Sequence, residues 1–143
     1  MEINKDLLES LLAEAKENPR LRQNFDLRTS FADTSQRMLN ALQPQTEVPI
    51  HQHEKTAETV ICLVGKLEEI IYEEVNEYVH EATSCCDDVI RQKSFKEVSR
   101  QILSPADGKF GIQIPAGAWH TVNVIEPSVI FEAKDGTYRG NDR

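Results

Sequence analysis

Apolar residues near the start of the chain recur at the spacing of an α-helix. Leucines and one alanine return every three or four positions, and charged residues fill the places between them. Asn4 suits an N-cap, and Asn18-Pro19 suits a helix end, because proline disfavours helical backbone at the residue before it. The pattern therefore predicts one amphipathic helix between Asn4 and Asn18. Its apolar face consists of Leu7, Leu8, Leu11, Leu12 and Ala15.

From Met38 onward the pattern changes to short runs of β-branched, aromatic and aliphatic residues separated by turn residues. The run from Leu67 to Val75 interleaves apolar residues with glutamates, which is typical of a strand with one face in water. Several short strands without helices between them predict an antiparallel sandwich or barrel, an all-β fold. The predicted strands are 38–42, 59–64, 67–75, 95–103, 110–114, 121–125 and 128–133.

The length of 143 residues fits one domain. We expect residues 1–30 to form the helix and a connecting segment that packs on the barrel, and residues 31–143 to form a single barrel domain. The formal net charge of −8, with no basic run, argues against nucleic acid or an anionic membrane as a partner. No apolar stretch approaches the ~20 residues of a membrane span, and no signal-peptide pattern is visible. The three cysteines, two of them adjacent, fit a reducing cytoplasm.

Candidate metal ligands gather in two segments. In the first, His51 and His53 lie two residues apart, so that both side chains point to the same face of an extended segment. Glu58 follows after a short turn and is expected on the same strand face as Val60 and Cys62, because alternate residues of a strand share a face. In the second segment, the turn Pro115-Ala116-Gly117 leads to His120 at the start of a strand.

Three imidazoles and one carboxylate suit a divalent transition metal, and this mixed nitrogen and oxygen set disfavours calcium or magnesium. We therefore expect one ion of Fe, Mn, Ni or Zn as cofactor. A six-coordinate metal with four protein ligands keeps two positions for water or substrate, which is an open, reactive arrangement. The expected ligands are His51, His53, Glu58 and His120.

The spacing of these residues resembles the cupin family. The string His-x-His, four residues, Glu58, six residues, Gly65 matches the first cupin motif, and Pro115-x-Gly117-x-x-His120 matches the centre of the second. The resemblance implies a small cupin or jelly-roll β-barrel, here with an N-terminal helix, and metal binding by the four ligands.

A narrower resemblance is to the WbuC-type cupin-fold metalloproteins, whose genes are often found in surface-polysaccharide clusters. Three segments carry it: 35–44, then 111–115 with Trp119-His120, and 131–138. Gln113 stands where family members usually have Glu. The resemblance implies fold and metal binding, and it suggests a small sugar or sugar nucleotide as substrate. It brings no assigned reaction.

Three residues are candidates for substrate binding. Asn40 shares a strand face with Met38 and Leu42, Gln113 alternates with two isoleucines and is expected to face the metal cavity, and Tyr138 lies near the end of the chain. The glutamates at 68, 69, 73, 74 and 77 are interpreted as a solvated face. A second metal site at His80, Glu81 and 85–88 is a weaker interpretation than a solvated loop, because adjacent cysteines match no metal-ligand spacing.

Two classes of function remain open. One is a metal-dependent enzyme with isomerase- or epimerase-like chemistry on a sugar, with an iron-dependent dioxygenase as a variant. The other is a non-catalytic cupin that binds or senses a small ligand, because the fold hosts both classes. In either case the expected partner is a small molecule, with carbohydrate as the leading candidate. A homodimer is also expected, since small cupins often cover exposed strand edges with a partner.

Overall fold

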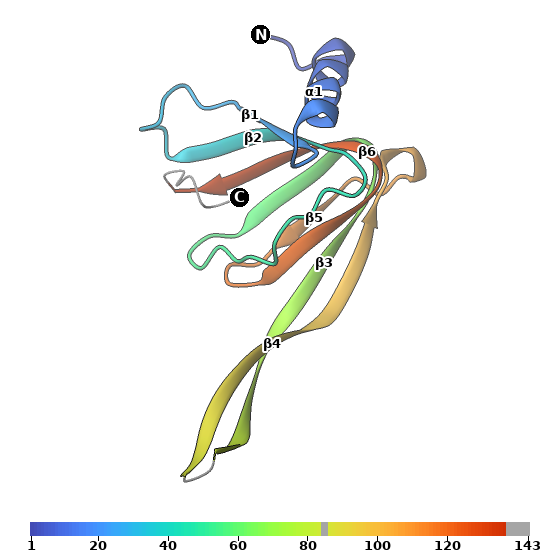
Figure 1. Cartoon of the computed structure of the whole chain (residues 1–143). Helices are drawn as coiled ribbons and strands as arrows, with labels where there is room; N and C mark the ends of the chain where they lie inside the picture. Colours follow the sequence, from blue (N-terminus) through green and yellow to red (C-terminus); the bar gives the residue numbers. More distant parts are fainter. Residues whose placement is uncertain (84–85, 137–143) are drawn as a thin grey trace.

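The computed structural model describes residues 1–83 and 86–136, with side chains except for those of residues 79–90. One helix packs on a sheet of antiparallel strands, which confirms the predicted all-β fold with an N-terminal helix (Figure 1). A single turn of 3-10 helix, η1, spans Pro105–Asp107. The other elements are α1 (Lys5–Glu17), β1 (Arg22–Asp26), β2 (Ser35–Leu42), β3 (Glu58–Thr83), β4 (Cys86–Leu103), β5 (Gly111–Ile114) and β6 (Trp119–Asp135).

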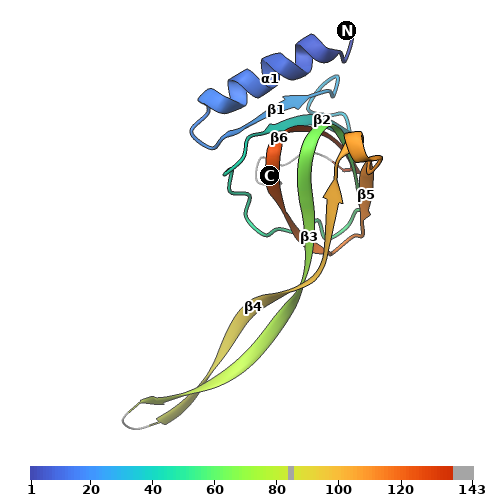
Figure 2. The ribbon, with the colours of Figure 1, turned by 90° about the vertical axis from the view of Figure 1, so that its right-hand side faces the viewer.

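The sheet has the order β1-β2-β6-β3-β4, and β5 pairs with the first residues of β3. It curls around an interior, and α1 lies against its outer side beside β1 and β2 (Figure 2). The barrel is not closed by hydrogen bonds among the strands that the structure describes. Strand β1 falls in the segment that we expected only to connect helix and barrel, where it adds an edge strand to β2.

Two pairs of predicted strands are each one bent strand in the structure. Segments 59–64 and 67–75 belong to β3, and segments 121–125 and 128–133 belong to β6. The register between these strands shifts three times from Cys62 to Leu67, which bends both of them. Gly65 permits the bend: its φ is +96°, and a Cβ there would lie 2.2 Å from the carbonyl oxygen of Pro127.

Both faces of the curled sheet are buried in places. Inside the barrel, Val60, Leu67, Leu103 and Ile130 form an apolar core. Outside, Leu11 and Ala15 of α1 pack against a second cluster that includes Leu39 and Ala41 of β2. Neighbouring residues of β2 therefore serve different cores, and Asn40 shares the inner face with Leu42.

Beyond the pair Tyr72↔Trp119, β3 leaves β6 and continues with β4 as a long two-stranded hairpin (Figures 1 and 2). The pairing extends to Thr83↔Cys86. The interpretation of His80, Glu81 and 85–88 as a solvated loop is therefore wrong for residues 80, 81 and 86–88, whose backbone is strand. The weaker hypothesis of a second metal site at His80, Glu81 and 85–88 falls on side chains outside the described part of the molecule.

Candidate metal centre

The first cupin motif and the second meet at a short β-bridge. The His51 amide donates to the His120 carbonyl at 3.0 Å, and the His120 amide donates back to the His51 carbonyl at 2.8 Å. The amide of Gly117 donates to the carbonyl of His53 at 2.8 Å, which ties the loop that carries His53 to the turn before His120. Backbone hydrogen bonds thus bring together histidines that are about 70 positions apart in the sequence.

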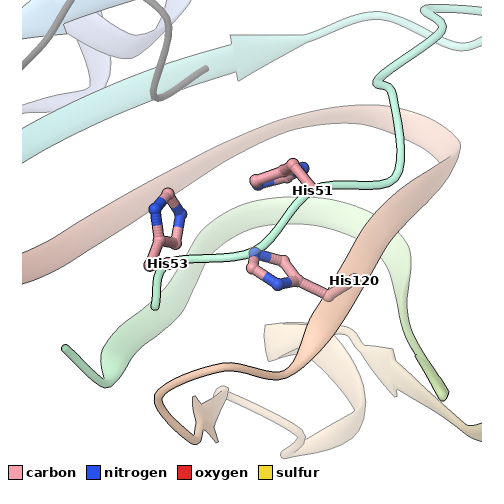
Figure 3. A group of neighbouring side chains, drawn as sticks. All are labelled: His51, His53 and His120. Carbon is pink, nitrogen blue, oxygen red and sulfur yellow. The ribbon is translucent and has the colours of Figure 1, made fainter. Parts of the chain in front are cut away.

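The three imidazoles converge on one point (Figure 3). His51 and His53 come from the loop before β3, and His120 comes from the start of β6. One ring nitrogen of each lies within 4.8 Å of the others. Nitrogens bound to one metal at about 2.1 Å lie about 3 to 4 Å apart, so small side-chain movements are enough to close this group around an ion.

Backbone carbonyls orient two of these rings. Nδ1 of His51 lies 2.8 Å from the Pro49 carbonyl oxygen, and Nδ1 of His120 lies 2.9 Å from that of Ala118. A carbonyl oxygen only accepts, so each Nδ1 carries the proton and donates it. In the neutral ring Nε2 then holds the lone pair, which is the tautomer that a histidine ligating a metal through Nε2 requires. The Nε2 of His120 is buried and makes no hydrogen bond in the structure.

Glu58 completes the cluster from the first residue of β3. Its side chain is 1% exposed. Oε2 lies 3.0 Å from Nε2 of His53 and 3.6 Å from Nε2 of His120. These separations are close to those between neighbouring ligand atoms of one transition metal ion. The four residues expected from the sequence are therefore brought together, and their donor set fits the expected metal.

Lys134 reaches into the same cluster from β6. It lies opposite Glu58 in the β3–β6 register, and cross-strand partners share a face. Its Nζ lies 3.1 Å from Nδ1 and 3.3 Å from Nε2 of His53. From the sequence alone this lysine is, like Tyr138, a weaker candidate, because an exposed tail is an equally good interpretation of the segment. Only the register of β3 with β6 shows that this lysine faces the cluster, because it pairs a residue near the end of the chain with Glu58 of the first motif.

Two buried carboxylates also face the interior. Glu69 is fully buried and shares the inner face of β3 with Leu67. Glu132 is 7% exposed and lies two residues from Lys134 on the inner face of β6. The interpretation of Glu69 as part of a solvated face is wrong. The sequence did contain a sign of its burial: Glu69 lies two residues from the apolar Leu67, and alternate residues of a strand share a face.

The three predicted substrate-binding residues have different positions. Asn40 lies on the inner face of β2, fully buried, and neither side-chain amide atom makes a hydrogen bond in the structure. Gln113 is exposed on the outer face, where its Oε1 accepts from the Thr59 hydroxyl at 3.0 Å. The register pairs Ile114 with Glu58, so the isoleucines of β5 face inward, and the expectation that Gln113 faces the cavity is corrected. Tyr138 lies outside the described residues.

Cys62 lies on the inner face of β3 and is buried. Burial raises the pKa of its thiol to about 11. The thiol donates to the carbonyl of Val64 at 3.4 Å. This cysteine is therefore a neutral packing residue of the core at physiological pH.

A family model described as Domain of unknown function (DUF6016) matches residues 3–83, more than half of the chain. A comparison with curated proteins finds no match. In the part of the chain that the structure describes, none of the helices has the length and apolar character needed to cross a membrane.

Several solved structures are similar to this one. TT1209 from Thermus thermophilus has a TM-score of 0.59 at 20% identity, over 95% of this chain and 98% of that chain. The cupin domain of Cnp3 from Schizosaccharomyces pombe has a TM-score of 0.50 at 11% identity, and the match covers 80% of this chain and 64% of that chain. The capsular polysaccharide assembling protein CapF from Staphylococcus aureus has a TM-score of 0.51 at 18% identity, and the match covers 87% of this chain and 30% of that chain. At these identities the likeness shows the fold alone, a cupin jelly roll.

Proposed function

We propose that the chain, which belongs to the DUF6016 family, is a metalloprotein that binds one divalent transition metal ion where its two cupin motifs meet. The single observation that carries the proposal is the convergence of three imidazoles and a carboxylate, two of the rings being held with Nε2 as the lone-pair nitrogen. The proposed metals are Fe, Mn, Ni and Zn. The proposed ligands are His51, His53, Glu58 and His120.

The charges of the interior support a divalent cation. Among the described side chains, Glu58, Glu69 and Glu132 are buried carboxylates on the inner face, and Lys134 brings one ammonium to the same face. An excess of negative charge is costly in a medium of low dielectric constant. A divalent metal ion offsets the negative charge of ionised carboxylates on this face, so its binding stabilises their burial.

We further propose that the site acts on a small sugar or sugar derivative as an isomerase or epimerase. The bound metal would supply Lewis-acid polarisation of a substrate oxygen. Such chemistry needs a group that moves a proton, and Glu132 is our candidate because it is buried, faces inward and lies beside Lys134. The sugar class rests on the resemblance to WbuC-type proteins.

Elemental analysis of the protein purified without added metal tests the metal proposal. We expect about one equivalent of Fe, Mn, Ni or Zn in the parent protein and little in the His51→Ala and His120→Ala variants. Glu54→Gln is a matched control, because Glu54 is an exposed acid of the same loop. Full metal content in both histidine variants would show that the ion binds elsewhere.

A second measurement separates the enzyme from a non-catalytic binding protein. Metal-loaded protein is incubated with a panel of aldoses, ketoses and sugar nucleotides in D₂O, and deuterium incorporation at carbon is followed by NMR. We expect exchange with the parent protein and none with Glu132→Gln at equal metal content. Binding of a sugar without exchange would favour a ligand sensor, and oxygen consumption by an iron-loaded protein would favour a dioxygenase.

A further inference from the structure

The far part of the β3–β4 hairpin stands away from the barrel as an arm (Figures 1 and 2). We define the arm as residues 73–83 and 86–96, the register pairs beyond the last contact of β3 with β6. A strand rises about 3.3 Å per residue, so the arm is about 35 Å long. Among the strands that the structure describes, neither β3 nor β4 has a second neighbour in the arm. The outer edges of both strands therefore carry unpaired backbone groups.

The arm is anchored at its base and uncovered farther out. At the base, the Phe95 ring lies 4.9 Å from the Trp119 ring, and Nζ of Lys93 lies 4.5 Å from the centre of the same indole. Farther along, Tyr78 is 70% exposed. An isolated two-stranded ribbon is only marginally stable in water, and free strand edges tend to pair with another chain. Exposed tyrosine beside free edges is typical of an interaction surface.

The two strands of the arm carry opposite charges. Among the described side chains, at 73–78 and 91–96, β3 has three acids and no base, and β4 has three bases and no acid. These residues are Glu73, Glu74 and Glu77 on β3, and Arg91, Lys93 and Lys96 on β4. Oε1 of Glu74 lies 3.4 Å from Nη2 of Arg91 and 3.7 Å from Nζ of Lys93. The other three charged side chains form no ion pair with a described residue.

We infer that two copies of this chain associate through their arms, with β3 of each copy beside β4 of the other. A partner with one sign of charge is repelled by one of the two strands, because like charges in an interface are costly. A second copy, turned about an axis along the arm, presents its basic strand to the acidic one and its acidic strand to the basic one. This rotation is the two-fold symmetry commonest among homo-oligomers. Because β3 and β4 run in opposite directions, the new neighbours are antiparallel, and both free edges gain a partner.

The register indicates which charges meet in this arrangement. Glu73 and Lys96 are partners in the β3–β4 pairing, so they lie at the same height along the arm. A two-fold axis along the arm keeps that height, and Glu73 of each copy comes level with Lys96 of the other. Glu77 is paired with Gln92, the neighbour of Arg91, so it comes level with this part of the basic strand. Each of these contacts occurs twice in the dimer.

Sedimentation velocity of the full-length protein over a range of micromolar concentrations tests the inference. Glu73→Lys/Glu77→Lys makes β3 basic, and Arg91→Glu/Lys96→Glu makes β4 acidic. We expect the parent to be a dimer. Each variant alone should raise the dissociation constant of the dimer about tenfold or more, because four attractive contacts become repulsive. An equimolar mixture of the two variants should regain the dimer, because it places a basic β3 beside an acidic β4.

Glu14→Lys/Glu17→Lys is the matched control. It makes the same change in net charge at exposed positions of α1, and it should dimerise like the parent. Circular dichroism and thermal melting establish that each variant is folded. A parent that is monomeric at every concentration overturns the inference. So does a Glu73→Lys/Glu77→Lys dimer as strong as that of the parent, or a mixture that associates no better than either variant alone.

Discussion

The replacement His120→Ala separates the packing role of this residue from its proposed role as a ligand. The side chain is fully buried in the barrel. Truncation of a large buried side chain costs roughly 2 to 4 kcal/mol of unfolding free energy. Loss of metal binding removes a further amount that depends on the metal concentration, about 2.7 kcal/mol when free metal is about 100 times Kd.

The two contributions are separated by thermal unfolding with and without metal. In a chain of this size 1 kcal/mol corresponds to roughly 3 to 4 °C in Tm. Metal should therefore raise the Tm of the parent protein by about 10 °C, and it should leave the Tm of His120→Ala almost unchanged. In the chelator-treated proteins, the variant should melt below the parent by the packing cost alone.

Ile114→Ala is the matched control for this experiment. Ile114 is 1% exposed, lies opposite Glu58 in the register and has no atom that binds metal. Its truncation should lower Tm by a similar amount with and without metal, and it should preserve the metal-induced rise. The reasoning is refuted if metal raises the Tm of His120→Ala as much as that of the parent, because His120 is then only a packing residue.

Three further outcomes are expected. Glu58→Gln should weaken metal binding less than His51→Ala does, because its amide oxygen still coordinates; metal titration that gives the reverse order contradicts this ranking. Burial raises the pKa of Cys62 to about 11, so the thiol should resist iodoacetamide at pH 8 until the protein unfolds. Mass spectrometry of the Cys62 peptide measures the labelling, and rapid labelling of the native protein would contradict this prediction. Light scattering should give the mass of a homodimer, and a monomer would remove that prediction.

The sequence alone determined the fold class and the identity of the clustered residues. Helical spacing from Leu7 to Ala15 and alternating strands beyond Met38 are local patterns, and the structure confirms both. The spacing of His51, His53 and Glu58 is also local, because parity on one extended segment sets which side chains converge. The resemblance of the motif around His120 then implied that it joins them.

Only the tertiary structure decided the rest of the interior. Which face of a strand points inward depends on its register with neighbours, and one shifted residue exchanges the two faces. The pair Glu58↔Ile114 turned Gln113 outward, and the pair Glu58↔Lys134 brought a lysine from the far end of the chain to His53. Glu69, in a run of glutamates with the composition of a solvated surface, is a buried carboxyl group for the same reason. Composition describes a residue by itself, whereas burial depends on pairings between segments that are distant in the sequence.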